Sequence, residues 1–230
     1  MDWKPAQKPA GLAESRLISA ILDGIFPIDS YLPAERELAE QIGVTRPTLR
    51  EALQRLTRDG WIEIHHGRPT RVRNYWEEGN LGVLGAIAGH AGPIQSHFVG
   101  DLLSVRLVMA PAYTRLAVDR SPEPVTDCLV QLSTLEDTPS AFTSADWRLH
   151  HLLTVASGNP IYTLILNGFR DLYQEAGEVY FTPVEARYLS RSFYTELLAA
   201  THLRDAQRAE EITSRVMMAS LEMWHSRHLP

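Results

Sequence analysis

At 230 residues, of which 44% are hydrophobic, the chain is long enough to bury a sizeable core in one small and one larger domain. Its single cysteine, Cys128, excludes an internal disulfide framework and is typical of a reducing cytosol. No basic segment followed by an apolar run opens the chain, and no stretch approaches the roughly 20 apolar residues of a membrane span. We therefore expect a cytoplasmic protein that makes no use of a membrane.

The formal net charge of −6 is divided unevenly along the chain. Residues 1–75 carry 11 Lys and Arg against 10 Asp and Glu, whereas residues 76–230 carry 11 against 18. A locally basic surface suits a nucleic-acid partner, and a strongly acidic one does not. The charge distribution therefore indicates that any contact with nucleic acid belongs to the first third of the chain.

In chain order, the first predicted element is a helix from Leu12 to about Gly24, followed by a loop. Residues 32–43 predict a short helix that ends at a glycine. Residues 44–56 predict a second helix, with Thr45 as N-cap and Pro47 in the first turn, where proline is tolerated. Two short helices joined by a glycine-containing turn are typical of a helix-turn-helix, whose second helix enters the major groove of DNA.

A hairpin is predicted directly after the second of these helices. Residues 61–64 and 69–73 have the pattern of two short strands around the segment 65–68. Such a hairpin is a wing, and its basic, glycine-bearing tip could reach the minor groove. Arg68 in this tip is a candidate contact to the DNA backbone or groove. Residues 1–75 are therefore predicted to form a winged helix-turn-helix domain that binds double-stranded DNA.

The candidate base contacts lie on the second helix of this motif. Arg46 and Arg50 are four residues apart, so they share one helical face, opposite an apolar face of leucines. The planar fork of arginine can bind O6 and N7 of guanine together. The hydroxyls of Thr45 and Thr48 can bind phosphates from the helix N-terminus.

Arg36 on the first helix is a further candidate contact to the DNA backbone or groove. For any one of these arginines alone, a solvated charged face is the simpler interpretation. The helix-turn-helix and the wing together favour DNA binding.

Beyond a polar linker at residues 76–80, the segment 81–230 has helical periodicity throughout and no strand-like alternation. The predicted helices lie near 81–89, 93–118, 122–136, 139–156, 160–181, 184–201 and 203–227. Proline and glycine mark the breaks between them, most clearly at residues 157–160. The fold class is therefore mainly α, with the winged helix-turn-helix followed by an all-helical antiparallel bundle, and such bundles place ligand sites between their helices.

Three motifs of the first domain, PAERELA (33–39), VTRPTLREAL (44–53) and GWI (60–62), resemble the GntR family of bacterial transcription regulators. The second domain, with ASGNP (156–160), resembles the all-helical FCD effector domain of that family. The likeness is greater still to the branch that controls fatty acid metabolism. It extends through residues 58–61, 66–67, 74–77, 102–106, 157–162 and 164–168.

This resemblance implies a homodimer that binds a pseudo-palindromic operator and is released when long-chain acyl-CoA enters the helical domain. It implies repression of fatty acid degradation genes and activation of unsaturated fatty acid synthesis genes, with no cofactor beyond the effector ligand. The DNA contacts of the family fall on Arg36, Thr45, Arg46, Thr48, Arg50, His66 and Gly67. Pro47 stands where related regulators have threonine, so one hydroxyl contact is lost.

For the acyl-CoA pocket the resemblance points to Leu102, Leu103, Arg106, Tyr173, Tyr180, Tyr194, Ser220 and Trp224. An acyl chain needs an apolar tunnel, and CoA needs cations, hydroxyls and an aromatic surface. Arg106 interrupts an apolar helical run, so it either contacts the ligand or forms a buried salt bridge. Ala219 and Leu229 stand where related regulators have glutamate and lysine, which leaves the phosphate end of the pocket less well defined.

A metal site is the main alternative for the second domain. Many relatives with this effector domain hold a metal through one aspartate and three histidines. Asp146 and His150 match the first pair of that set, four residues apart on one helical face. Thr195 and Met217 stand at the two remaining histidine positions. Other histidines that could substitute are His151, His202 and His225.

Catalysis is a third interpretation, with Asp146, His150 and His151 as acid and base groups. No nucleophile elbow, glycine-rich phosphate loop or complete metal motif accompanies them. We therefore expect a DNA-binding regulator without a metal and without enzymatic activity. A regulator that senses a small carboxylate through a metal at Asp146 and His150 is the alternative.

Overall fold

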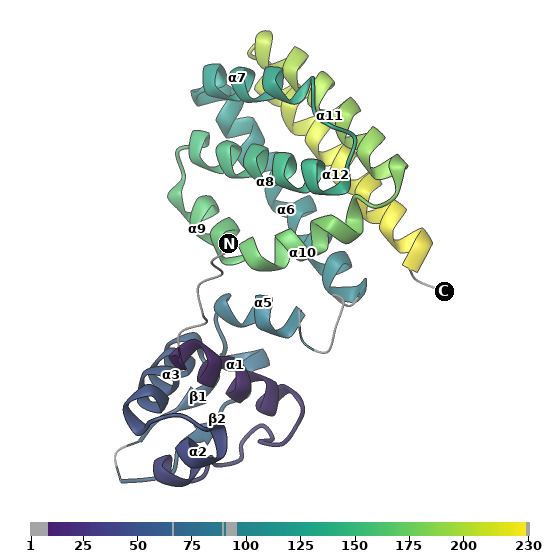
Figure 1. Ribbon diagram of the computed structural model, residues 1–230. Helices are drawn as coiled ribbons and strands as arrows, with labels where there is room; N and C mark the ends of the chain where they lie inside the picture. The colour runs from purple at the N-terminus through teal and green to yellow at the C-terminus, as the bar shows by residue number, and fades with distance from the viewer. Residues whose placement is uncertain (1–8, 66, 89, 91–95, 229–230) are drawn as a thin grey trace, which may run out of the picture. The chain divides into compact units, whose positions relative to one another are not determined.

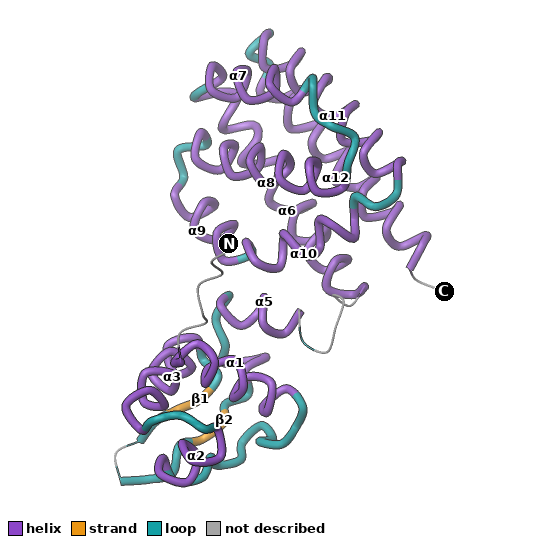
Figure 2. The backbone as a smooth tube through the Cα atoms, in the orientation of Figure 1, coloured by secondary structure: helices purple, strands orange, loops and turns teal. Residues whose placement is uncertain are grey.

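The computed structural model describes residues 9–65, 67–88, 90 and 96–228, and the chain forms two compact units, Met1–Ala91 and Gly92–Pro230. The described residues are mainly helical, with one small hairpin in the first unit (Figures 1 and 2). None of the described helices is long and apolar enough to cross a membrane. The mainly helical fold class is confirmed.

Within its described residues, the first unit contains three helices, a two-stranded hairpin and two further short helices. In order these are α1 (Pro9–Leu22), α2 (Glu35–Ile42), α3 (Arg46–Asp59), β1 (Ile62–Glu63), β2 (Arg71–Val72), α4 (Tyr75–Glu78) and α5 (Gly82–Ala88). Helix α1 packs along α3 and α2 against α3, around a core in which Leu17, Leu38, Leu49 and Trp61 are almost fully buried. This arrangement confirms the winged helix-turn-helix.

The ends of α2 and α3 are set by the residues that the sequence singles out. Helix α2 ends because Gly43 takes a left-handed conformation (φ +75°) and donates its N–H to the carbonyls of Ala39 and Glu40. Thr45 is the N-cap of helix α3, and its hydroxyl accepts the N–H of Thr48. These two ends fix the turn of the helix-turn-helix.

The wing is shorter than predicted. Its antiparallel strands pair over two residues each, Ile62 with Val72 and Glu63 with Arg71. Tyr31, from the loop before α2, forms an isolated bridge to Arg71 and so adds a third segment to the small sheet. The buried Ile62 and Val72 anchor the hairpin to the core, and this anchoring holds the wing beside α3.

The segment after the wing, interpreted from the sequence as a linker at 76–80, carries α4 and lies within the first unit. The ring of Tyr75 is buried, with its centroid 4.9 Å from that of Trp61. Glu78 binds Arg71 at 3.2 Å. Burial and ion pairing thus attach this segment to the wing. The boundary between the two compact units follows residue 91, and not residues 76–80.

The described part of the second unit is all helical (Figure 1). Its helices are α6 (Ser96–Arg120), α7 (Pro122–Leu132), α8 (Pro139–Ala156), α9 (Pro160–Gly168), α10 (Arg170–Tyr180), α11 (Val184–His202) and α12 (Ala206–His228). Helices α6 and α12 make the most extensive contact, and α8 packs on α6, α7 and α10. Phe142, Leu149 and Phe193 are almost fully buried between these helices.

Two predicted helices of this unit differ from the structure. The helix expected at 160–181 is two helices, because the backbone bends at Phe169 (φ −92°, ψ 1°), which follows Gly168. The helix expected at 122–136 ends at Leu132. Gly168 is helical rather than left-handed, and no glycine or proline stands at the end of α7, so neither end has the usual sequence mark of a helix end.

Candidate DNA-binding surface and effector site

Helix α3 separates a buried face from an exposed one. Leu49, Leu53 and Leu56 are buried, whereas Arg46 and Arg50 are exposed on the other side. The hydroxyls of the capping pair Thr45 and Thr48 lie 2.8 Å apart at the helix N-terminus. The helix thus presents two guanidinium groups and two hydroxyls at the end that a recognition helix directs at bases.

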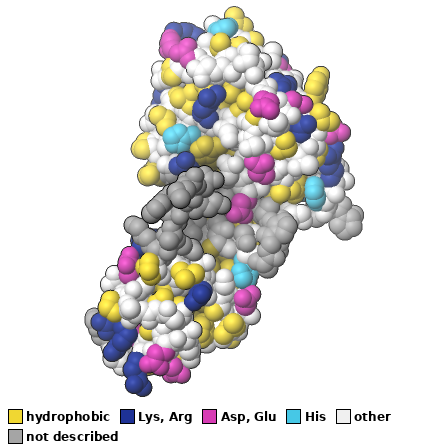
Figure 3. Space-filling view, viewed as in Figure 1, with side chains coloured by type: hydrophobic (Ala, Val, Ile, Leu, Met, Phe, Trp, Pro, Cys, Tyr) yellow, Lys and Arg dark blue, Asp and Glu magenta, His cyan; other side chains and the backbone are white. Residues whose placement is uncertain are grey.

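Three predicted DNA contacts, Arg36, Arg46 and Arg68, form no ion pair with a carboxylate of the described residues. Arg71 shows the opposite arrangement, since three carboxylates hold it within 3.3 Å. In the view of Figure 3, Lys and Arg side chains, coloured dark blue, lie on the surface of the first unit. An unpaired guanidinium gives up no protein partner when it binds a phosphate or a base, which suits these three to DNA.

The tip of the wing contains a glycine that its conformation requires. Gly67 has φ +73°, a left-handed conformation that favours glycine. A Cβ added there would meet nothing within 4 Å, so the backbone conformation and not a lack of space explains the glycine. His66, the other predicted contact of the tip, lies outside the described residues. Of the predicted contacts in the wing, Gly67 and Arg68 are therefore the two whose placement the structure describes.

A cavity lies between α6, α8 and α10 of the second unit. It contains about 20 Å³, room for about one water molecule. The structure brings five of the eight predicted acyl-CoA residues to its walls. These are Leu102, Leu103, Arg106, Tyr173 and Tyr180.

The other three predicted residues lie around this cavity, not in its walls. Trp224 is next to Tyr180, with ring centroids 6.4 Å apart, and its indole N–H donates to the carbonyl of Ser96. The hydroxyl of Ser220 donates to the carbonyl of Val216. Tyr194 faces a separate pocket of about 270 Å³ beside α7 and α11. A single ligand that touched all eight residues would have to span more than one cavity.

A buried polar network forms one wall of the small cavity. An Nη2 atom of Arg106 lies 3.0 Å from Asp146 Oδ2 and 2.7 Å from His150 Nε2. The hydroxyl of Tyr173 donates to Asp146, and that of Tyr113 lies 2.6 Å from His150 Nδ1. The side chains of Arg106 and Asp146 are only 10% and 3% exposed. Arg106 thus forms a buried salt bridge with Asp146, which is the second of the two interpretations that the sequence allows.

Burial and charge together set the protonation of this network. Burial is the largest single influence and would raise the pKa of Asp146, but the positive charge of Arg106 and the hydrogen bonds from Tyr173 and Arg106 together outweigh it and lower that pKa below its usual range. Burial, with Arg106 adding to it, lowers the pKa of His150 to about 3. Burial raises the pKa of Tyr180 to about 12. At neutral pH the network therefore contains a carboxylate, a guanidinium, a neutral imidazole and neutral phenols.

The tautomer of His150 follows from its two partners. A guanidinium can only donate, so Nε2 of the neutral ring must accept from Arg106. The proton then lies on Nδ1, which donates to the hydroxyl of Tyr113. The lone pair that a metal would need is occupied by Arg106.

Stability should fall with acidity because of His150. Its folded-state pKa lies below the ordinary value of about 6.5, so below that pH the unfolded chain binds a proton that the folded chain refuses. We expect the free energy of unfolding to decrease by up to about 1.4 kcal/mol per pH unit below pH 6.5. Urea denaturation between pH 5 and pH 8 measures this slope.

The variant His150→Gln is the control, since glutamine can still accept a hydrogen bond from Arg106 but cannot titrate. The pH dependence should be clearly shallower in this variant. Asp146 interferes little, because its stabilisation is lost only between the unfolded-state pKa of about 3.9 and its lower folded-state pKa, and both lie below the pH range of the experiment. An identical slope in both proteins would contradict the buried neutral histidine.

The structure does not fit the metal-site alternative. The Nη2 atom of Arg106 binds both Asp146 Oδ2, at 3.0 Å, and His150 Nε2, at 2.7 Å, and so takes up the atoms that would have to hold the metal. No group of three or more histidine, cysteine, aspartate or glutamate side chains suited to a metal occurs within the described ranges. His151 and His225 line pockets elsewhere, beside α7 and beside the start of α6.

Tyr113 is the network residue that the sequence analysis does not single out. It lies seven residues after Arg106, two turns along the same face of α6, and it is 2% exposed. A polar side chain two turns from a buried arginine on the same helix face indicates a candidate member of the same polar network. The partner on α8 is not visible in the sequence, since it depends on how the two helices pack.

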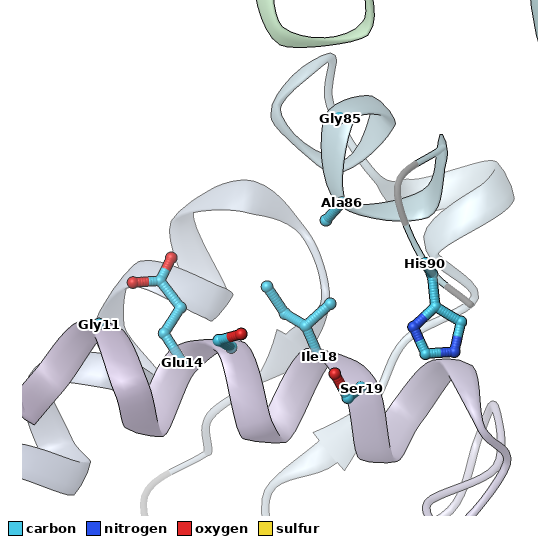
Figure 4. Close-up of a pocket in the computed structure, with 8 residues that line it drawn as sticks. Gly11, Glu14, Ile18, Ser19, Gly85, Ala86 and His90 are labelled. Carbon is cyan, nitrogen blue, oxygen red and sulfur yellow. The ribbon is translucent and has the colours of Figure 1, made fainter. Parts of the chain in front are cut away.

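A larger pocket of about 340 Å³ lies between α1 and α5 in the first unit (Figure 4). Glu14, Ile18 and Ser19 line it from α1, and His90 closes one end, bonded to Asp23 at 2.9 Å. None of the predicted DNA or effector residues lies in its walls. It is therefore separate from both candidate sites.

Two family models together match almost the whole chain. Residues 10–72 match "Bacterial regulatory proteins, gntR family", and residues 73–229 match "FadR C-terminal domain". The chain belongs to the GntR family, with a FadR-type C-terminal domain. As a GntR-family member it is a transcription regulator with a helix-turn-helix DNA-binding domain.

Curated relatives of this GntR-family chain support the same assignment. The "Fatty acid metabolism regulator protein" of Shewanella baltica (strain OS223) is 44% identical over 219 residues, which is 95% of this chain and 92% of the relative. The protein of the same name from Shewanella sp. (strain MR-4) is 49% identical over 192 residues, 84% of this chain and 80% of the relative.

One solved structure resembles the chain in its fold, and this likeness bears on the fold only. It is described as "Lar controls the expression of the Listeria monocytogenes agr system and mediates virulence", with a TM-score of 0.65 and 16% identity, and the match covers 98% of this chain and 99% of that one.

Proposed function

We propose that the chain regulates genes of fatty acid metabolism by binding a palindromic operator as a homodimer, from which long-chain acyl-CoA releases it. It represses fatty acid degradation genes and activates unsaturated fatty acid synthesis genes, and it carries no catalytic activity. The observation that carries the proposal is 44% identity, over 95% of the chain, to a protein named fatty acid metabolism regulator. The exposed, unpaired arginines beside α3 support the DNA half of the proposal.

The effector half rests on the small cavity beside α10. Because its volume is about 20 Å³, an acyl chain enters only if the lining side chains and helices move apart. Binding of acyl-CoA is thereby coupled to a rearrangement of α6, α8 and α10. A ligand shifts such an equilibrium only by its difference in affinity for the two states. DNA and acyl-CoA must then weaken each other by the same factor.

The dimeric DNA complex has a simple geometric test. Two recognition helices of one dimer meet half-sites about 34 Å apart, one turn of DNA. In sedimentation and gel-shift experiments we expect two chains for each palindromic operator of the fatty acid regulators. Insertion of about half a helical turn between the half-sites should abolish tight binding. Unchanged binding to the lengthened operator would contradict a fixed dimer.

Replacement of Arg50 by alanine should cost about 1–3 kcal/mol of operator binding and relax base preference at the contacted position. Arg50 is exposed near the N-terminal end of α3, where a guanidinium can reach base edges. Titrations of operator and random DNA at one salt concentration measure the change.

Arg55→Ala provides a matched control, because Arg55 lies on the same helix but later in it, where Glu14 of α1 and Glu51 of α3 bind its guanidinium. It should change operator binding far less than Arg50→Ala does. Equal losses on operator and random DNA for Arg50→Ala would show that Arg50 contacts only phosphate.

A further inference from the structure

Arg50 differs from the other exposed arginine of α3 in having a carboxylate partner. Its Nε atom lies 2.7 Å from Oε2 of Glu35, which is 15 residues earlier in the chain. Arg46 forms no such pair within the described part of the chain. Both partners are accessible, with side chains 62% exposed for Arg50 and 37% for Glu35. The pair therefore lies on the surface that α3 presents to DNA.

Glu35 is itself held in place by the helix-turn-helix. It is the first residue of α2, where a negative charge is favoured by the unsatisfied N–H groups of the helix start. The turn at Gly43 sets the angle between α2 and α3 and so places this carboxylate beside the first turns of α3. The backbone of the helix-turn-helix thus places the Glu35 carboxylate within reach of Arg50.

The atom used in the pair determines what Arg50 can still do. A guanidinium carries five N–H donors in one plane, and Glu35 takes the single donor on Nε. The end-on pair of donors, one on each Nη atom, has no acceptor within the described part of the chain. Two parallel donors are what O6 and N7 of guanine accept. The pair also limits the rotamers of a long side chain before DNA arrives, which lowers the entropy lost on binding.

We propose that Glu35 is a positioning residue for base recognition, which orients the guanidinium of Arg50 toward a guanine edge. This inference rests on the proposed operator binding and deepens it. Because the carboxylate also repels phosphates, Glu35 weakens binding to every DNA sequence while it improves discrimination between sequences. Orientation and charge therefore make opposite contributions, and different substitutions separate them.

Three single variants separate the two contributions. Glu35→Asp keeps the charge but shortens the side chain, so the contact to Arg50 is lost. Glu35→Gln keeps the length and an acceptor oxygen but removes the charge. Glu37→Gln is the matched control, because Glu37 is also in the first turn of α2 but bonds only to Gln41 among the described residues. Thermal unfolding confirms that each variant folds.

The measurement is the ratio of the dissociation constants for random DNA and operator, at several salt concentrations. We expect Glu35→Asp to lower this ratio by about 3- to 10-fold. Glu35→Gln should keep the ratio within about 2-fold while both DNAs bind more tightly, as they should for Glu37→Gln. In an Arg50→Ala background, Glu35→Asp should change the ratio no further.

A ratio that Glu35→Asp leaves unchanged, or that falls equally without Arg50, overturns the positioning role. Failure of the unaltered protein to prefer operator over random DNA is a different result, because it overturns the proposed function itself. If Glu35→Gln keeps the ratio of the unaltered protein and Glu35→Asp lowers it, the discrimination between sequences comes from the orientation of Arg50 and not from the charge of Glu35.

Discussion

Replacement of Asp146 by alanine will lower the free energy of unfolding by about 3–5 kcal/mol. The carboxylate is 3% exposed and accepts from Arg106 and Tyr173, so its removal leaves a buried guanidinium without a counter-charge. The buried, neutral His150 cannot replace that charge. Urea denaturation at neutral pH, followed by circular dichroism of the second unit's helices, measures the loss.

Two controls identify the cause of this loss. In the double variant Arg106→Met and Asp146→Leu, apolar groups replace both charges, and most of the stability should return. Asp137→Ala removes a carboxylate of the same unit that is 55% exposed and pairs with Arg187 and Arg191, and it should change stability little. An Asp146→Ala protein as stable as the unaltered chain would contradict the buried charge pair.

Replacement of Gly60 by alanine should destabilise the first unit by on the order of 3 kcal/mol or more. Gly60 joins α3 to the wing with φ +93°. A Cβ at this position would lie 2.8 Å from Cα of Gly79 and 2.9 Å from the carbonyl oxygen of Glu78. These are backbone atoms, so the collision can be relieved only by moving α4 away from the wing. Operator affinity should fall together with stability.

Gly24→Ala separates strain from collision. Gly24 also has a left-handed conformation, φ +74°, but a Cβ there would meet nothing within 4 Å. This variant should show the conformational penalty alone, a smaller loss than that of Gly60→Ala. Equal losses in the two variants would show that the close approach of residues 60 and 79 contributes nothing.

The DNA-binding half could be predicted from the sequence because its signals are local. Gly43 and Thr45 mark the ends of two helices through their own backbone and side-chain preferences. The four-residue spacing of Arg46 and Arg50 defines a face without reference to the rest of the fold. Proline and glycine likewise mark the limits of α8, which the structure places at the predicted residues.

The remaining features could not be predicted because they depend on contacts between distant segments. The ion pair of Glu35 with Arg50 depends on the angle between two helices. Whether Arg106 meets a ligand or an internal carboxylate is undecided in the sequence, and packing of α6 on α8 supplies Asp146. Gly177 packs against Thr143, where a Cβ would lie 2.5 Å from Cγ2, so the size of the cavity also follows from this packing.

The most direct test of the proposed regulation is a fluorescence anisotropy titration of a palindromic fatty acid operator at fixed salt, with and without oleoyl-CoA. The proposed function predicts tight, sequence-specific binding that oleoyl-CoA abolishes and free CoA does not, since the acyl chain must open the cavity beside Arg106 and Tyr173. Tight operator binding that oleoyl-CoA leaves unchanged would contradict acyl-CoA as the signal.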